Sequence, residues 1–205
     1  MKILVACEES QTVAKAFRKR GHDAYSCDVV GCSGGYPEFH LCGDVRGYLR
    51  SNWDLIVAHP PCTYITNSGV RWLHDDATRW VELWNSCEFF NLFLDHPCKR
   101  IAIENPIPHK YALGWLNRKY DQIIQPWQFG HKKIKATCLW LKGLPNLEPT
   151  DIVGPPPNNP EEKKKWAECH RMAPGPNRQK LRSKTYKGIA DAMAEQWGVC
   201  ETVTA

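Results

Sequence analysis

The chain has 205 residues, of which 42% are hydrophobic and 24% charged, a balance that is ordinary for one globular domain with a core of its own. No apolar run approaches the ~20 residues that a membrane span needs, and the start MKILVACEES does not resemble a secretion signal, so we expect a cytoplasmic protein without a membrane partner. The net charge of +5 permits a polyanionic partner. Ten cysteines without any Cys-x-x-Cys pair indicate reduced thiols and no metal site.

Apolar runs that end in polar residues alternate with segments of helical periodicity along most of the chain. The expected strands, in chain order, are 2–7, 22–28, 40–44, 53–59, 99–106, 121–130 and 136–143. The expected helices are 12–20, 79–96 and 183–198, and 143–178, rich in Pro, Gly and Asn, is expected to be mostly loop. This alternation predicts an α/β fold with a mostly parallel twisted sheet.

Three segments are expected within this single domain. Residues 1–142 form a catalytic core, 143–183 a loop-rich basic segment, and 184–205 a C-terminal helix that packs back on the core. The stretch 171–187 is basic and has no acidic residue, which indicates contact with nucleic acid rather than a merely solvated face.

The stretch HPPCTYITNSG places Cys62 behind two prolines at the end of an expected strand, where α/β sheets collect their ligands. Pro60 and Pro61 fix two φ angles, as suits a nucleophile that must be held in place. The alternative is a rigid loop with an incidental buried cysteine. Glu104 and Asn105 end another strand, and in a parallel sheet that end can lie beside Cys62, which favours a nucleophile and an acid in one pocket.

These motifs resemble those of the DNA (cytosine-5) methyltransferases, and the chain looks like a small, divergent, phage-type member. The family's Pro-Cys loop, with its later Ser and Gly, is similar to HPPCTYITNSG with Cys62 in register, and its Glu-Asn-Pro element is similar to residues 104–106. Its later arginine-bearing segment is similar to QFGHKKIKATCLWL, with Lys135 at the first arginine and Thr137 at the second. The likeness covers residues 3–141.

The resemblance implies a Rossmann-like methyltransferase fold with an antiparallel strand near the C-terminal side of the sheet. It also implies a reaction in which the Cys62 thiolate adds to carbon 6 of a flipped-out cytosine while protonated Glu104 hydrogen-bonds ring nitrogen 3. Asn105 would shape the pocket. Carbon 5 would then receive a methyl group from S-adenosylmethionine.

The resemblance also implies a cofactor site, formed by Cys7, Glu8, Glu9, Ser10, Asp28, Asp44, Val45 and Pro60. Asp28 would hold the ribose and Asp44 the adenine. The family's glycine-rich first loop is similar to VACEES, which has no glycine. Its carboxylates Glu8 and Glu9 either hold the methionine ammonium group or exclude the cofactor.

The expected partner is cytosine-containing DNA, contacted by Pro61, Thr66, Lys133, Lys135, Arg178 and Arg182. The family's target-recognition region is reduced to about 143–178, so the protein should read little sequence or borrow specificity from a partner. Two alternatives stay open. One is a relative that modifies pyrimidines in nucleotides or modified DNA with another donor, and the other is a nucleic-acid-binding derivative without catalysis.

Overall fold

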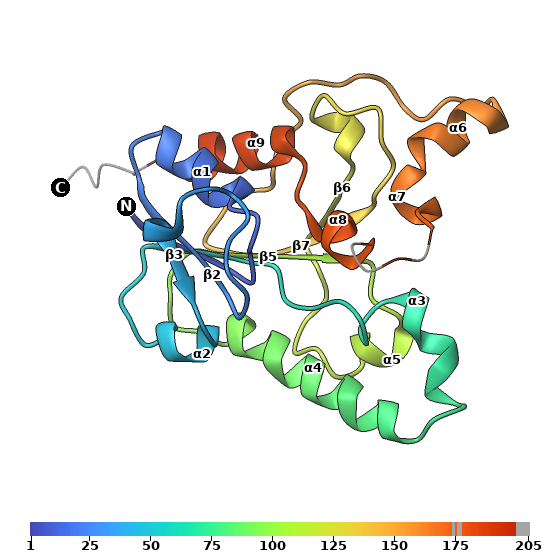
Figure 1. Cartoon of the computed structure of the whole chain (residues 1–205), viewed down its shortest axis with the longest axis horizontal. Helices are drawn as coiled ribbons and strands as arrows, with labels where there is room; N and C mark the ends of the chain where they lie inside the picture. The colour runs from blue at the N-terminus through green and yellow to red at the C-terminus, as the bar shows by residue number, and fades with distance from the viewer. Residues whose placement is uncertain (174, 176–177, 200–205) are drawn as a thin grey trace.

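The computed structural model describes residues 1–173, 175 and 178–199, and it shows the predicted α/β architecture. Within these residues a seven-stranded sheet has the order β3-β2-β1-β4-β5-β7-β6 (Figure 1). Its strands are β1 (Lys2–Ala6), β2 (Asp23–Asp28), β3 (His40–Cys42), β4 (Leu55–Ala58), β5 (Ile101–Pro106), β6 (Gln122–Ile124) and β7 (Thr137–Lys142). Strand β7 runs antiparallel to both of its neighbours, and the other strands run parallel, so the mostly parallel sheet is confirmed.

Helices cover both faces of the sheet, with α1 and α9 on one face and α2 and α4 on the other (Figure 1). The helices are α1 (Thr12–Lys19), α2 (Val45–Tyr48), α3 (Asn67–Val70), α4 (Thr78–Leu94), α5 (Lys110–Leu113), α6 (Pro160–Trp166), α7 (Glu168–Arg171), α8 (Arg178–Ser183) and α9 (Lys187–Trp197). Short 3₁₀ turns are η1 (Pro37–Phe39), η2 (Arg71–Leu73) and η3 (Pro126–Gln128). Across the described residues, no helix has the length and apolar character to cross a membrane.

The strand register brings the ends of the central strands level with one another. Ala6 of β1 pairs with Cys27 of β2 and Ala58 of β4, and Ala58 pairs with Ile103 of β5. The following residue in each strand therefore stands in one row along the carboxyl edge of the sheet: Cys7, Asp28, His59 and Glu104. The row includes the point between β1 and β4 where the strand order reverses, which is where open α/β sheets bind their ligands.

The antiparallel direction of β7 brings the start of that strand to the same edge. Thr137 pairs with Pro106 of β5 and with Ile124 of β6. The residues that precede β7, including Lys135, consequently approach the ends of the parallel strands. A parallel strand at this position would have brought its last residues here instead.

One sequence prediction needs correction, and a second is incomplete. Strand β6 stops at Ile124 rather than running to 130, because Pro126 offers no backbone N–H to a sheet and instead opens η3. In its described residues the segment 143–178 is mostly loop, as predicted, and it also contains α6 and α7, which the prediction left out. The start of α6 is specified locally by Asn159, whose side chain accepts the amides of Glu161 and Glu162. Of the segment 184–205, residues 200–205 lie outside the described part.

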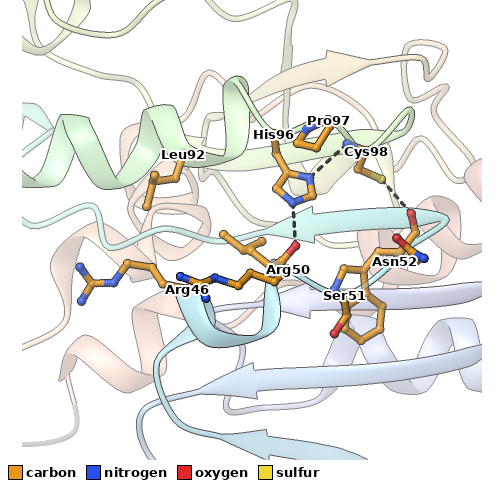
Figure 2. A pocket seen from close by; sticks show the side chains of 10 residues that line it. Arg46, Arg50, Ser51, Asn52, Leu92, His96, Pro97 and Cys98 are labelled. Atoms are coloured by element: carbon orange, nitrogen blue, oxygen red, sulfur yellow. Dashed lines mark hydrogen bonds between the residues drawn. The ribbon is translucent and has the colours of Figure 1, made fainter.

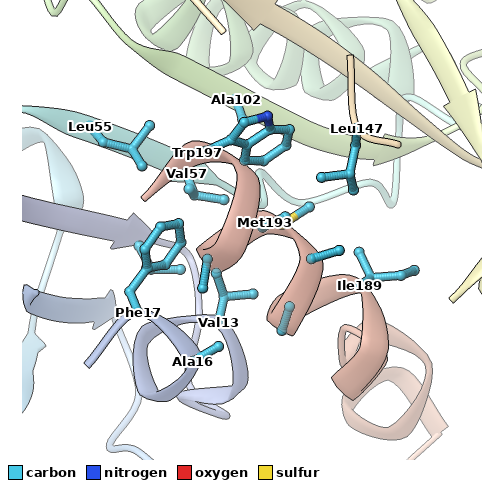
Figure 3. Close-up of a cluster of buried hydrophobic side chains, with 14 of the residues drawn as sticks. Val13, Ala16, Phe17, Leu55, Val57, Ala102, Leu147, Ile189, Met193 and Trp197 are labelled. Atoms are coloured by element: carbon cyan, nitrogen blue, oxygen red, sulfur yellow. The ribbon is translucent and has the colours of Figure 1, made fainter. Parts of the chain in front are cut away.

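The C-terminal helix α9 lies against α1 and the sheet, and together these elements form one of the two hydrophobic clusters of the core (Figure 3). Met193 and Trp197 of α9 are buried with Phe17 of α1 and Val57 of β4. The indole nitrogen of Trp197 also donates a hydrogen bond of 3.1 Å to the carbonyl of Pro145. Helix α9 is therefore part of the core that supports the central strands.

Replacement of Trp197 by alanine should lower the free energy of unfolding by about 3–5 kcal/mol, because it empties a fully packed site and leaves the Pro145 carbonyl without its donor. Urea denaturation followed by circular dichroism measures this change. Glu195→Ala on the exposed side of α9 is the control, and should cost less than about 1 kcal/mol because its ion pair with Arg20 is exposed. Equal losses in the two variants would contradict the packing role of α9.

Candidate active site

The loop that carries Cys62 is fastened to strand β5 and to its own following turn. The Asn105 side-chain amide, 1% exposed, donates a 2.8 Å hydrogen bond to the carbonyl of Pro60. The carbonyl of Cys62 accepts the amides of Ile65 and Thr66, both at 3.2 Å, and the Thr66 hydroxyl at 3.1 Å. Cys62 itself is half-buried. The two prolines and these bonds hold the thiol in one place, as expected for a positioned nucleophile.

A second set of contacts joins the same loop to the chain that follows β5. Thr66 forms an isolated β-bridge with Pro108. The amide of His109 donates to the carbonyl of Ile65 at 3.0 Å, and its ring Nε2 lies 2.9 Å from the carbonyl of Tyr64. The thiol loop and the Glu-Asn-Pro element are thus bound together at both ends, although about 45 residues separate them in sequence.

Glu104 is buried at the end of β5, with 8% of its surface exposed, and its Oε2 lies 2.9 Å from Nδ1 of His59. Burial alone would raise the pKa of Glu104. The hydrogen bond from His59, the charge of Lys135 and the hydroxyl of Thr137 outweigh burial and hold this pKa below its usual value. Glu104 is therefore a carboxylate at neutral pH, and the protonated form that the family resemblance implies is not its ground state.

The thiol of Cys62 is affected by the same charges in the opposite sense. Burial raises its pKa first, and the carboxylate of Glu104 raises it further. The positive charges of Lys135 and Arg182 lower the pKa, but the net direction is upward. Cys62 therefore rests as a thiol, and two cations stand where they can stabilise its thiolate.

Lys135 lies just before the antiparallel strand β7, which places it beside Glu104 and Cys62. Lys135 is only 9% exposed, its amide donates to Oε1 of Gln125 at 3.1 Å, and its ammonium donates to the carbonyl of Lys184 at 3.3 Å. Thr137, which the resemblance aligns with the second arginine of the methyltransferases, places its hydroxyl near Glu104. The structure thus brings together Cys62, Glu104 and Lys135 from three separate segments.

The predicted cofactor residues lie farther along the same edge. Cys7 has a φ of 58°, a left-handed conformation that costs energy for any residue with a side chain. Burial, and then the carboxylates of Asp28 and Asp44, raise its pKa, which puts both carboxylates near this thiol. Asp28 accepts the amide of Val30 at 3.2 Å, and Asp44 forms an ion pair with Arg46 at 2.5 Å. Two acceptor-bearing side chains therefore flank the turn after β1.

The Glu8 side chain caps the start of helix α1. Its buried carboxylate accepts the amides of Val13 at 2.6 Å and Ala14 at 3.1 Å, and the Ser10 hydroxyl at 3.4 Å. Burial raises the pKa of Glu8, against the opposing effects of nearby His59 and of these hydrogen bonds. Carboxylates are favourable at a helix N-terminus because they satisfy its free amides. Both oxygens thus already have partners within the protein.

The remaining residues of the first loop are tied to the loop after β2. The carbonyl of Glu9 accepts the amide of Ser33 at 2.9 Å. The side chain of Gln11 donates to the carbonyl of Tyr36 at 2.8 Å and accepts the amide of Tyr36 at 3.1 Å. Val45 is buried beneath this edge in the first turn of α2. These bonds hold the two loops against each other.

The predicted nucleic-acid residues fall into two groups. Lys135 and Arg182 lie close enough to Cys62 to influence its pKa. Lys133 instead forms an ion pair with Glu168, and Arg178 donates from Nε to the carbonyl of Met172 at 2.9 Å. Of the loop residues, Pro61 is exposed beside Cys62, whereas Thr66 is buried.

His59, for which the sequence predicts no role, is the direct hydrogen-bond partner of Glu104. The sequence feature that could have identified His59 is its position immediately before Pro-Pro-Cys, at the end of an expected strand. The other ring nitrogen, Nε2, and Oδ1 of Asn105 are buried without a hydrogen-bond partner among the described residues. Buried polar atoms nearly always have partners, so two such atoms at one strand edge indicate a place where a ligand binds.

No group of three or more His, Cys, Asp or Glu side chains in the described part of the chain could hold a metal ion. His40, near several cysteines in sequence, lies 2.8 Å from the Ser26 hydroxyl and 2.9 Å from the Val30 carbonyl. The cysteines of the described residues are free thiols.

A larger pocket, of about 580 Å³, lies where the chain enters β4 and β5, away from the thiol (Figure 2). His96 and Cys98 line it after helix α4, and Arg50 lines it after α2. Their polar groups are used within the fold, since Nε2 of His96 lies 2.9 Å from the Leu49 carbonyl and the Cys98 thiol donates to the Trp53 carbonyl at 3.2 Å. This pocket is a junction between helices at the amino edge of the sheet.

Comparisons with known proteins do not assign a family. No protein-family model matches the chain, and no curated protein matches it. The geometry of the strand edge is therefore what bears on function.

The charges around Cys62 predict how fast it reacts with iodoacetamide. Glu104→Gln removes the carboxylate that disfavours the Cys62 thiolate. The pH dependence of Cys62 alkylation should therefore shift to lower pH, and alkylation at pH 8 should become faster. Lys135→Gln should have the opposite effect. Mass spectrometry of the peptide with Cys62 measures the rates, and the exposed Cys42 is the internal control. Unchanged rates at Cys62 in both variants would show that these charges do not reach the thiol.

Proposed function

We propose that this protein is a DNA (cytosine-5) methyltransferase-like enzyme that transfers a methyl group from S-adenosylmethionine to carbon 5 of cytosine. The observation that carries the proposal is the meeting of Cys62, Glu104 and Asn105 at the ends of β4 and β5, with Asp28 and Asp44 along the same edge. These are the positions that the family resemblance assigns to the reaction and to the cofactor. A sheet whose antiparallel strand β7 lies near its C-terminal side supports the Rossmann-like methyltransferase fold.

In the proposed reaction, the Cys62 thiolate forms a bond to carbon 6 of a flipped-out cytosine, and the ring electrons move toward nitrogen 3. Lys135 and Arg182 stabilise the thiolate before it attacks. S-adenosylmethionine supplies the methyl group that carbon 5 receives. Loss of the proton from carbon 5 to a water molecule then restores the ring double bond and expels the Cys62 thiolate. Sulfur suits both steps because it is a strong nucleophile and a good leaving group.

Nitrogen 3 needs a proton in this scheme, yet Glu104 is a carboxylate at neutral pH. We assign His59 as the source. As an imidazolium, His59 passes its Nδ1 proton to Oε2 of Glu104, 2.9 Å away, and the carboxylic acid so formed passes that proton on to nitrogen 3. Both transfers reverse when the thiolate leaves, so the pair returns to its initial charges. Asn105 holds the Pro60 carbonyl throughout and keeps Cys62 in line with the base.

The residues at the edge fit the cofactor in part. Asp28 is half-buried, and its hydrogen bond from Val30 leaves acceptor positions for two ribose hydroxyls. The left-handed conformation of Cys7 gives the loop after β1 a turn of the kind that glycine usually makes. Asp44 can accept an adenine amino group beside its ion pair with Arg46.

A second function is favoured by the state of Glu8. Its carboxylate occupies the amides at the start of α1, where a helix would otherwise offer an anion-binding site. The loops after β1 and β2 are also bonded together through Gln11 and Tyr36. Both observations favour a relative that modifies pyrimidines in nucleotides or modified DNA with a different donor.

The nucleophile is tested by trapping on an oligonucleotide that carries 5-fluorocytosine. Once carbon 5 has received a methyl group, its fluorine cannot leave as a proton does, so with S-adenosylmethionine present the adduct with Cys62 should persist and run as a shifted band on a denaturing gel. Cys62→Ser should give no adduct, and Cys42→Ser, which changes an exposed thiol elsewhere, should give as much as the unchanged protein. An adduct that survives Cys62→Ser would remove Cys62 from the reaction.

The donor is tested by isothermal titration with S-adenosylmethionine, with and without DNA. Asp28→Ala should weaken binding by about 10- to 100-fold, because charge-assisted hydrogen bonds to the ribose are worth about 1.5–3 kcal/mol. Asp75→Ala, in an exposed turn before α4, is the matched control and should bind normally. Absence of heat under both conditions would reject methyl transfer from this donor and leave the second function.

A further inference from the structure

A second pocket, of about 230 Å³, is lined by Lys135 and Arg182, the two cations that lower the pKa of Cys62. Its polar lining comes from two parts of the chain, the segment before β7 and residues 168–186: Lys133, Lys135, Glu168, Arg182, Lys184 and Tyr186. Arg182, Lys184 and Tyr186 lie outside residues 3–141, the part of the chain that resembles the methyltransferase family. The pocket therefore depends on a segment for which that resemblance makes no structural prediction.

Positive charge dominates this lining. Four cationic side chains face one carboxylate, Glu168, which forms an ion pair with Lys133. The ammonium of Lys135 is buried and has three donors, of which the hydrogen bond to the Lys184 carbonyl uses one. Nε of Arg182 is buried without a hydrogen-bond partner among the described residues. The carboxylate of Glu104 balances the charge of Lys135, but a buried donor without a partner is costly, which indicates that an anion completes this pocket.

The size of the pocket limits what the anion can be. Sites that enclose a drug-sized ligand measure about 300–1,000 Å³, so this pocket is smaller than the usual ligand site. It suits a compact group with several acceptor oxygens, and a guanidinium with an ammonium is the usual pair of donors for phosphate. Tyr186 borders the site, with its ring centroid 6.0 Å from the Lys135 ammonium.

We propose that this pocket binds the phosphate group of the nucleotide whose base reaches Cys62, with Arg182 and Lys135 as its main contacts. The inference rests on the proposed function for the identity of the base. Lys135 lies two residues before Thr137, which pairs with Pro106, and the neighbouring Asn105 bonds the loop of Cys62. The pocket and the thiol therefore lie at the same strand edge, as a base and its own phosphate require. The phosphate belongs either to a DNA strand or to a free nucleotide. With a strand, the neighbouring nucleotides must bind as well, whereas a free nucleotide binds alone.

The test measures binding without any methyl donor, by competition against a fluorescent oligonucleotide. The ligands are deoxycytidine, deoxycytidine 5′-monophosphate, a short single-stranded oligonucleotide with one cytosine, and the same oligonucleotide with a neutral methylphosphonate on the 5′ side of that cytosine. The variants are Arg182→Gln, Arg182→Lys and, as the control with the same loss of charge, Lys163→Gln on the exposed side of α6. Thermal denaturation verifies that each variant is folded.

Arg182→Gln should weaken binding of the phosphate-bearing ligand by about 10- to 100-fold, while Arg182→Lys should retain part of the affinity and Lys163→Gln nearly all of it. Binding of deoxycytidine and of the methylphosphonate oligonucleotide should change little in any variant. A defect with the monophosphate assigns the pocket to a free nucleotide, and a defect with the oligonucleotide alone assigns it to a strand. The proposal is overturned if Arg182→Gln binds all phosphate ligands normally, or if Lys163→Gln shows the same loss.

These outcomes are separate from the fate of the proposed function. If Arg182→Gln loses phosphate affinity but no 5-fluorocytosine adduct forms on Cys62, the pocket stands and the proposed reaction fails. If the adduct forms and Arg182→Gln binds normally, the reaction stands and the phosphate site lies elsewhere.

Discussion

The hydrogen bond between His59 and Glu104 joins the ends of two neighbouring parallel strands in a place where both side chains are about nine-tenths buried. Its partners depend on each other, because removal of either one would leave a buried charge or an unpaired ring nitrogen. The bond also sets the charge of Glu104, which in turn raises the pKa of Cys62. The reactivity of the thiol is therefore governed by a contact that Cys62 does not itself make.

The antiparallel direction of β7 has a chemical consequence. It turns the start of the strand toward the carboxyl edge, so that Lys135 and Thr137 face Glu104. These two residues balance a carboxylate that burial alone would tend to neutralise. The same geometry brings the segment around Arg182 to the thiol, since the Lys135 ammonium is bonded to the carbonyl of Lys184. One reversed strand thus links the strand edge to the basic part of the chain.

The loop after β1 shows two opposite features within a few residues. Cys7 adopts a left-handed backbone that glycine would adopt without strain, which keeps the turn needed for close approach of a ligand. Glu8 then fills the start of α1 with its own carboxylate. The first feature suits a nucleotide-like cofactor at the strand edge, and the second restricts how its charged end can be held. The choice between the two proposed functions, with S-adenosylmethionine or with a different donor, depends on this loop.

The sequence by itself determined the α/β class, the approximate positions of all seven strands and the two motifs around Cys62 and Glu104. Apolar runs, helical periodicity and prolines act on the backbone locally, so these features can be read without partners. The length of β6 and the helices α6 and α7 were less accessible, because short elements depend on single capping or proline residues. Only the tertiary structure decided which side chains meet. The His59–Glu104 bond and the pocket of Lys135 with Arg182 depend on strand register and on packing between segments that lie about 45 and 47 residues apart in sequence.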